Sequence, residues 1–186
     1  MKRTIVPLTM MLALSACSSP PQPAVAELHN EAGKLNQQVR QLTHQASAIE
    51  RQSQLNLNST SGAWLVPAAN TPVELLSNAG KIRLSLSHVA QEANGTRAIL
   101  HLRSADAASL PGMTAKIQWG QLDAASGKPL QAESLSQEIA IPSSLMPQPD
   151  AEVPLRLSGV MPQQLIYVRV HDLVVTSPAA SAEKQP

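Results

Sequence analysis

The sequence predicts a mainly β protein, an antiparallel β-sandwich of about seven strands with an immunoglobulin-like outline, preceded by one long α-helix. Three observations predict it. Apolar residues recur every seven positions between residues 28 and 49, which is a helical spacing. From about residue 81 apolar and polar residues alternate, as in strands with one buried face. Loop-forming stretches separate these segments, which favours a sandwich, with a small barrel as the alternative.

Residues 1–16 are typical of a signal peptide. Lys2 and Arg3 supply a positive start, and the run 5–14 is almost wholly apolar. A helix needs roughly 20 apolar residues to span a bilayer, so this run is too short to be a transmembrane anchor.

Cys17 is the only cysteine, and it follows directly on this apolar segment. The stretch "LSAC" resembles the lipobox of bacterial lipoproteins. The resemblance implies a diacylglycerol thioether on Cys17, cleavage before it, and acylation (palmitate) of the new amine. Three acyl chains exceed the two signals needed for stable anchoring. Ser18 and Ser19, in place of aspartate, imply sorting to the outer membrane with the protein facing the periplasm. The inner membrane is the alternative.

Residues 17–25 form a lipidated, proline-rich tether in this interpretation, and an amphipathic helix follows over 26–56. Its d positions are Leu28, Leu35, Leu42 and Ile49, and its a positions are Ala32, Val39, Ala46 and Ser53. Two interpretations remain open: a coiled coil with itself or with a partner, or a single amphipathic helix that packs on the following domain or stays solvated.

The β-sandwich domain is expected over 57–176, with a disordered tail at 177–186. Six strands can be placed individually from alternation and β-branched residues. They are 81–89, 96–104, 114–122, 136–141, 151–159 and 164–175.

The Asn94-Gly95 pair marks a turn between the first two of these strands. An odd-length loop over 93–95 would align Leu86 with Leu102 and keep both apolar faces on one side. In that register His88 follows the apolar face and His101 the polar face, so the two histidines point apart and no metal pair is expected.

The β region with its preceding helix resembles the YajI-type bacterial lipoproteins, a family that carries a domain of unknown function. The resemblance lies in "SGAWLVPAANTPVELL", "GKIRLSLSHV", "WGQL", "VPLRLSG" and "VRVHD". It covers roughly residues 35–175. It implies an anchored periplasmic domain, and it brings no known activity and no functional residues.

Composition excludes several classes of function. The formal charge is +1 and becomes −1 once Lys2 and Arg3 are removed, so no basic excess exists for nucleic acid. Trp64, Trp119 and Tyr167 are the only aromatic residues, too few for a stacking platform. No nucleophile elbow, phosphate loop or metal-ligand spacing occurs. We therefore predict no catalytic residues, no metal and no cofactor.

The favoured hypothesis is a non-catalytic envelope lipoprotein that acts as a structural or protein-interaction module. The membrane is contacted through Cys17, and the helix 26–56 self-associates or binds an envelope partner. Tyr167, Arg169 and His171 share one face of the last strand, so a small-ligand site near Tyr167 and Arg169 is the alternative. The adjacent His171 and Asp172 are expected on opposite faces. An unrecognised hydrolase is a third hypothesis.

Overall fold

The computed structural model describes residues 22–57, 59, 61–106, 109–123, 125–130, 134–144 and 150–176. The signal segment, Cys17 and the tail at 177–186 lie outside this part. The chain divides into two compact units, Met1–Arg40 and Gln41–Pro186. The first contains the N-terminal part of helix α1, and the second contains the rest of that helix and all strands of the described residues.

Helix α1 spans Gln22–Leu57. It therefore begins inside the stretch 17–25 that the sequence predicts as a tether. A proline in the first turn is compatible with this start, because the N–H that proline lacks would have no helical partner there. Leu57 ends the helix one residue after the predicted boundary.

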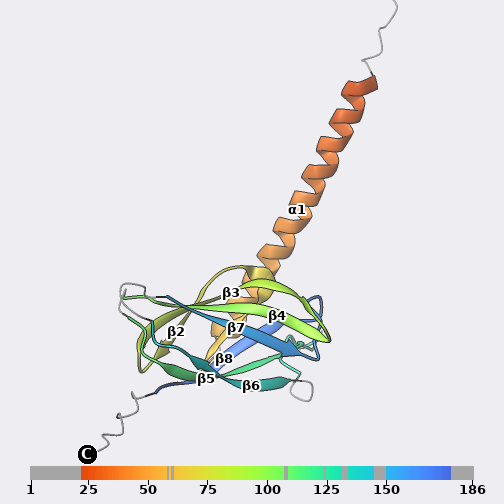
Figure 1. Cartoon of the computed structure of the whole chain (residues 1–186). Coiled ribbons are helices and arrows are strands. Elements are labelled where there is room, and N and C mark those ends of the chain that lie inside the picture. Colours follow the sequence, from red (N-terminus) through yellow and green to blue (C-terminus); the bar gives the residue numbers. More distant parts are fainter. Residues whose placement is uncertain are drawn as a thin grey trace, which may run out of the picture. The chain divides into compact units, whose positions relative to one another are not determined.

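Within the described residues, eight strands form two four-stranded antiparallel sheets (Figure 1). One sheet has the order β1-β8-β5-β6 and the other β2-β3-β4-β7. The strands are β1 (Ala63–Leu65), β2 (Val73–Ser77), β3 (Gly80–Glu92), β4 (Gly95–Ser104), β5 (Met113–Gly120), β6 (Leu135–Ile141), β7 (Asp150–Ser158) and β8 (Tyr167–Val175). The β-sandwich prediction is confirmed, and the six strands placed from the sequence correspond to β3–β8. The short strands β1 and β2 lacked a clear alternation.

The hydrophobic core lies between the two sheets and is built from alternating aliphatic side chains. Strand β7 shows the pattern most clearly, because Ala151, Val153, Leu155 and Leu157 are buried and the residues between them are exposed. Trp119 is the one aromatic residue of this core, and its indole N–H donates to the Ser158 carbonyl at 3.1 Å. The core is therefore packed mainly with aliphatic side chains, because the sequence contains few aromatic residues.

The turn between β3 and β4 differs from its prediction. Glu92 pairs with Gly95, so the loop is the two-residue Ala93-Asn94. Leu86 consequently pairs with Leu100 and not with Leu102. A bulge between Ser87 and Ala90 inserts the extra residue that keeps both apolar faces toward the core. The alternation does require one additional residue, but this residue lies in the bulge of β3 and not in the loop.

Candidate functional site

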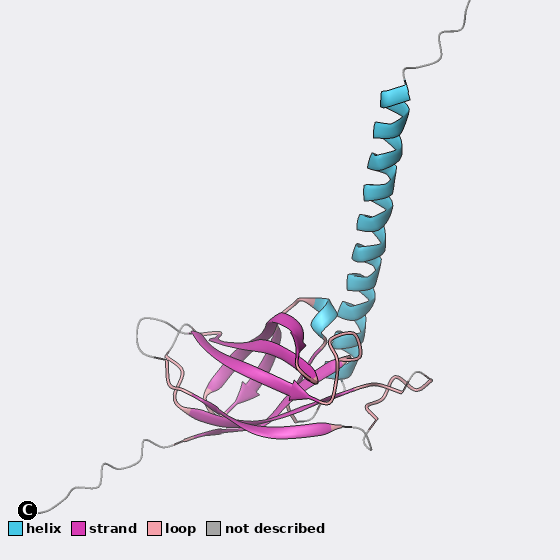
Figure 2. Ribbon diagram, turned by 45° about the vertical axis from the view of Figure 1, so that its right-hand side comes forward, coloured by secondary structure: helices cyan, strands magenta, loops and turns pink. Residues whose placement is uncertain are grey.

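The last turns of α1 pack on the β-domain within the second unit. Ala48 is buried against Val66 and Ala69, and Leu55 joins this small cluster. Ala69 belongs to the short 3₁₀ helix η1 (Pro67–Ala69) that follows β1. Figure 2 shows η1 beside the C-terminal end of α1. The buried area is small, so polar contacts must add to the attachment of the helix.

Two side-chain amides of α1 supply those contacts at the free edge of β1. Asn56 accepts the Trp64 N–H at 2.9 Å and donates to the Trp64 carbonyl at 2.7 Å. Gln52 accepts the Val66 N–H at 2.8 Å and donates to the Thr71 hydroxyl at 2.9 Å. These backbone groups face away from β8, so without the amides the outer edge of β1 would be left without hydrogen-bond partners.

Within the second unit, the heptad residues Leu42 and Ile49 of α1 do not take part in this packing. In the first unit the exposed fractions are 72% for Leu28, 62% for Leu35 and 52% for Val39. In the second unit they are 64% for Leu42 and 40% for Ile49. The face of α1 that binds the β-domain is thus a different face from the heptad stripe, which we define as the a and d positions of residues 28–49.

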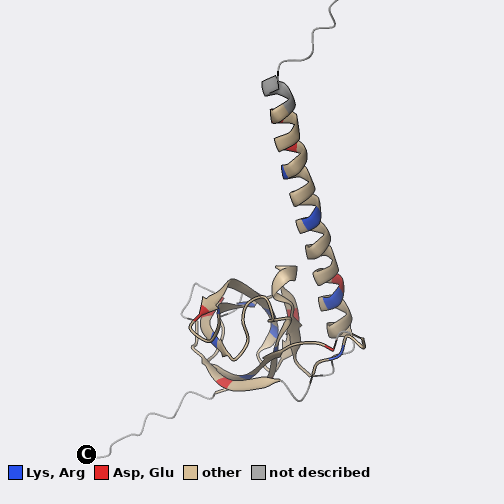
Figure 3. Cartoon of the chain, turned by 90° about the vertical axis from the view of Figure 1, so that its right-hand side faces the viewer, with Lys and Arg blue, Asp and Glu red and all other residues tan. Residues whose placement is uncertain are grey.

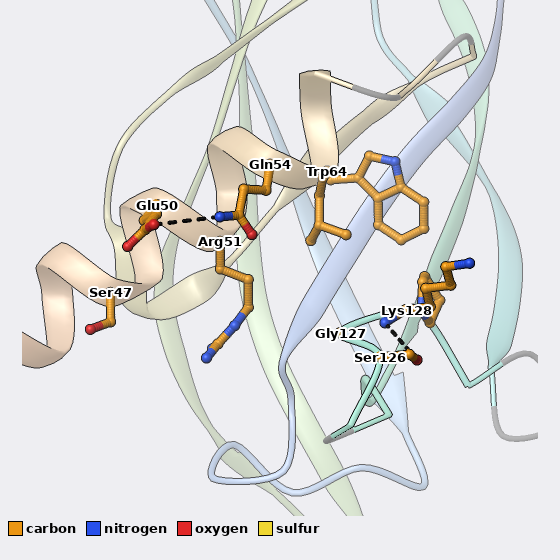
Figure 4. Close-up of a pocket in the computed structure, with 10 residues that line it drawn as sticks. Ser47, Glu50, Arg51, Gln54, Trp64, Ser126, Gly127 and Lys128 are labelled. Carbon is orange, nitrogen blue, oxygen red and sulfur yellow. Dashed lines mark hydrogen bonds between the residues drawn. The ribbon is translucent and has the colours of Figure 1, made fainter.

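A groove of about 680 Å³ lies between the C-terminal part of α1 and the loop after β5, within the second unit. Figure 4 shows Arg51 reaching from the helix and Lys128 from the loop, with Trp64 at one end. Glu50 also lines the groove, and Gln54 donates to its carboxylate at 3.4 Å. Its apolar lining comes from Leu55, Trp64 and Pro129.

The loop that carries Lys128 is held by Asp123. The Asp123 carboxylate accepts the backbone N–H and the hydroxyl of Ser126, both at 2.7 Å. These hydrogen bonds favour the charged form and so lower the pKa of Asp123 below its ordinary value. The bond from the Ser126 hydroxyl contributes most. The wall of the groove is therefore a hydrogen-bonded turn.

The predicted ligand face near Tyr167 and Arg169 is largely covered. Tyr167 is fully buried, and its ring centroid lies 5.0 Å from that of Trp64. The Arg169 guanidinium lies 4.9 Å from the centre of the Trp64 ring and donates to the Ser61 carbonyl at 2.7 Å. The two residues are on the face expected from alternation, but the Trp64 ring packs against both of them. The groove beside Trp64 remains as the accessible space.

Burial raises the pKa of the Tyr167 phenol, and the neighbouring Arg169 partly opposes this effect. The Tyr167 hydroxyl and the Arg169 Nε have no hydrogen-bond partner among the described residues. This aromatic and cationic cluster is therefore a packed element that positions Trp64.

The structure corrects the expected separation of His88 and His101. His88 has a φ of +51° in the bulge of β3, and its side chain is exposed instead of following the apolar face. The Ser87 hydroxyl lies 2.8 Å from His88 Nδ1 and 2.5 Å from His101 Nε2. His101 Nδ1 lies 3.3 Å from a Glu152 carboxylate oxygen. Four polar side chains from β3, β4 and β7 thus form one connected row.

A second bulge corrects the expectation for His171 and Asp172. Asp172 has a φ of +51°, and the register between β5 and β8 shifts at this position. Asp172 Oδ2 therefore lies 3.4 Å from His171 Nδ1 and 3.1 Å from Lys116 Nζ. The hydrogen bond from Lys116 makes the largest contribution to lowering the pKa of Asp172, and the one from His171 makes the second largest. Adjacent strand residues share a face where a bulge interrupts the alternation.

Other charges are distributed as cross-strand pairs. Figure 3 shows lysines, arginines and carboxylates dispersed over the described ribbon. Among the described residues, no group of three or more His, Cys, Asp and Glu side chains is placed to hold a metal ion. Within the same residues no helix is long and apolar enough to cross a membrane.

A family model described as "Protein of unknown function (DUF3251)" matches residues 17–181. The chain belongs to the DUF3251 family. A relative in Escherichia coli (strain K12), described as "Uncharacterized lipoprotein YajI", is 32% identical over 163 residues. The match covers 88% of this chain and 90% of that relative. The predicted resemblance to YajI-type lipoproteins is therefore confirmed.

Two solved structures are similar to this DUF3251 protein. The solution NMR structure of YajI from Escherichia coli matches with a TM-score of 0.68 at 29% identity, covering 77% of this chain and 85% of that one. The Salmonella enterica trimeric lipoprotein SadB matches with a TM-score of 0.53 at 16% identity, covering 83% of each chain. The second likeness concerns the fold alone.

Sequence reasoning missed Gln52, Asn56 and Ser87. The two amides occur in a glutamine- and asparagine-rich helix, where most such side chains are exposed. Gln52 and Asn56 are four residues apart, and with Ala48 and Leu55 they form a helix face distinct from the heptad stripe. This spacing is the one feature of the sequence that could have indicated them. Nothing in the local pattern of "LSLSHVAQE" marks Ser87 as the start of a bulge.

Proposed function

We propose that this DUF3251 protein is a non-catalytic envelope lipoprotein that self-associates through the heptad stripe of α1. The observation that carries the proposal is that α1 uses one face for its own β-domain while the heptad leucines remain exposed. A solvated helix gains nothing from leucine at every seventh position, whereas a coiled coil buries those positions.

The heptad stripe favours another copy of this chain as the partner. The stripe pairs leucine or isoleucine at d with small or β-branched residues at a, a register that identical helices can share. The description of SadB as trimeric supports association of this kind, with three chains as the expected number. A different envelope protein on the stripe is the competing outcome.

Analytical ultracentrifugation of the full chain in detergent tests self-association. We expect a discrete oligomer that dissociates when Leu35 and Leu42 are both replaced by serine. Gln37→Ser with His44→Ser is the matched control, because these residues occupy outward f positions of the same heptads. A wild-type chain that stays monomeric at micromolar concentration would refute the proposal.

We further propose that acyl chains on Cys17 hold the protein to the outer membrane with the β-domain in the periplasm. The lipobox and the lipoprotein relatives support this placement. Metabolic labelling with tritiated palmitate should mark the wild-type chain and not Cys17→Ala. In a sucrose gradient the wild-type protein should sediment with the outer membrane, and Ser18→Asp should move it toward the inner membrane. Sedimentation of the wild type with the inner membrane would select the alternative.

The row Ser87, His101, Glu152 has the order of a hydrolase triad, yet we assign it no catalysis. The side chains of His101 and Glu152 are 33% and 66% exposed, so water screens the charges that would activate a serine. A fluorophosphonate probe should therefore leave Ser87 unmodified. Covalent labelling that His101→Ala abolishes would overturn the non-catalytic assignment.

A second candidate function is binding of a small anionic ligand in the groove beside Trp64. The cationic side chains Arg51 and Lys128 and the apolar lining favour an aromatic anion. Anilinonaphthalene sulfonate is a suitable probe. Its fluorescence enhancement should fall in the Arg51→Ala, Lys128→Ala double variant and persist in Leu35→Ser, Leu42→Ser. An unchanged signal in the first variant would remove this candidate.

A further inference from the structure

The bulge in β3 brings two histidines to one oxygen atom on the outer face of the β2-β3-β4-β7 sheet. Ser87 Oγ is within hydrogen-bonding distance of His88 Nδ1, at 2.8 Å, and of His101 Nε2, at 2.5 Å. The two imidazole nitrogens therefore point toward a common position. In a regular strand the adjacent residues Ser87 and His88 would point to opposite faces, and His88 would face the core. The two histidines could then not meet at Ser87.

Glu152 selects the tautomer of His101. Its carboxylate lies 3.3 Å from His101 Nδ1, and a negative oxygen at that distance favours a proton on this nitrogen. The lone pair of Nε2 is then directed at the Ser87 hydroxyl, which His88 Nδ1 also contacts. A carboxylate behind one imidazole nitrogen, with the other nitrogen free to bind, is the arrangement that orients histidines at metal centres.

We propose that His88 Nδ1 and His101 Nε2 bind a divalent transition-metal ion, Cu²⁺ in preference to Zn²⁺, at the position now held by the Ser87 hydroxyl. Imidazole suits both ions, and the affinity of nitrogen sites increases from Zn²⁺ to Cu²⁺. Binding requires bonds of about 2.0–2.1 Å, so the exposed His88 ring rotates as the serine hydroxyl moves aside. Water completes the coordination.

The surrounding charges permit a cation here. Three of the nearby arginines are paired with carboxylates: Arg103 with Asp150 at 3.1 Å, Arg83 with Glu74 at 3.1 Å, and Arg156 with Glu92 at 3.7 Å. Glu152 adds a further negative charge beside His101.

Arg97 lines a shallow cavity next to His88 and opposes a cation. With two protein ligands and this opposing charge, we expect micromolar and not nanomolar affinity.

Isothermal titration of the full chain in detergent, with CuCl₂ and then ZnCl₂ in a non-coordinating buffer, tests the site. The helix residues His29 and His44 are first replaced by glutamine to remove two exposed imidazoles. We expect one micromolar Cu²⁺ site per chain and weaker Zn²⁺ binding. His88→Ala and His101→Ala should each weaken Cu²⁺ binding at least tenfold, and Glu152→Gln should weaken it about tenfold, as loss of an orienting carboxylate does.

His171→Ala is the matched control, because this histidine also adjoins a carboxylate but lies on the other sheet. It should leave Cu²⁺ affinity unchanged. Electron paramagnetic resonance supplies an independent readout, since the bound Cu²⁺ should show hyperfine coupling to two imidazole nitrogens that is reduced to one in His101→Ala. Absence of saturable Cu²⁺ binding would overturn the proposal, and so would equal binding by the wild type and His88→Ala.

Discussion

Asn56 pairs with the backbone of Trp64 as a residue of a neighbouring strand would. Its amide both accepts the Trp64 N–H and donates to the Trp64 carbonyl, at 2.9 and 2.7 Å. Gln52, one helical turn earlier, accepts from Val66, two residues later in the strand direction. Four residues of helix rise about 6.0 Å and two residues of strand about 6.6 Å, so the two spacings match. The helix thereby closes the β1 edge.

Removal of either amide should destabilise the β-domain. Gln52→Ala leaves the buried Val66 N–H without an acceptor, which costs about 1–3 kcal/mol. Asn56→Ala should cost a similar amount because two bonds to Trp64 are lost. Urea unfolding measures both changes. Gln41→Ala on an exposed part of the same helix is the control and should alter stability by less than about 0.5 kcal/mol.

Two glycine substitutions should have opposite effects. Gly62 has a φ of +89°, and a Cβ there would collide with the Val170 carbonyl and lie 2.7 Å from His171 Cβ. Gly62→Ala should therefore push β1 from β8 and lower the thermal midpoint of the β-domain.

In contrast, a Cβ at Gly33 in α1 would meet nothing within 4 Å. Gly33→Ala should favour the helix by about 1 kcal/mol. Circular dichroism follows both variants, and a tolerated Gly62→Ala would contradict the close approach of β1 to β8.

The Tyr167 hydroxyl should contribute little to stability. It has no hydrogen-bond partner among the described residues, so Tyr167→Phe should change the free energy of unfolding by less than about 1 kcal/mol or increase it. Tyr167→Ala should cost about 3–5 kcal/mol because the buried ring is lost. A cost of several kcal/mol for Tyr167→Phe would reveal a bond to the hydroxyl.

Tyr167 should also ionise at higher pH than a free tyrosine. Burial raises the pKa of the phenol in the folded state. The unfolded state then loses its proton first, so stability should fall as the pH rises above the ordinary tyrosine pKa. The chain contains one tyrosine, so absorbance at about 295 nm follows this group alone. Titration at the ordinary value would show that the ring is solvated.

The Lys116–Asp172 pair should make the stability of the β-domain depend on pH in the acid range. Hydrogen bonds from Lys116 and His171 lower the pKa of Asp172 in the folded state. Its stabilising effect is therefore present above the ordinary aspartate pKa and is lost as the pH falls through the lowered value. Asp172→Asn should be less stable than wild type at neutral pH and nearly equal at the acid end. A constant difference across the titration would exclude this linkage.

The strands with a clear alternation were predictable. Leu84, Leu100 and Leu102 lie in the core as the pattern indicates, because a strand with one buried face must place apolar residues at every second position. β1 was not predictable, since three residues show no period and its placement depends on Asn56 and β8. The heptad spacing of the leucines was evident from the sequence. That a different face of α1 packs on the β-domain was not.

Both errors at the histidines have one physical cause. Strict alternation holds only for regular strands, whereas His88 and Asp172 both have positive φ at a bulge. A bulge depends on the register with the neighbouring strand, which is a contact distant in sequence. No local residue preference marks either position, so the Ser87–His101 and His171–Asp172 contacts can be found only from the tertiary structure.

By itself, the sequence determined the helix and the alternating strands and predicts the lipid anchor at Cys17, because these depend on local periodicity and short motifs. Only the tertiary structure decided which face of α1 attaches to the β-domain, where the bulges fall, and which side chains meet at Ser87 and Trp64. The reason is that edge pairing and strand register are set by hydrogen bonds between distant segments.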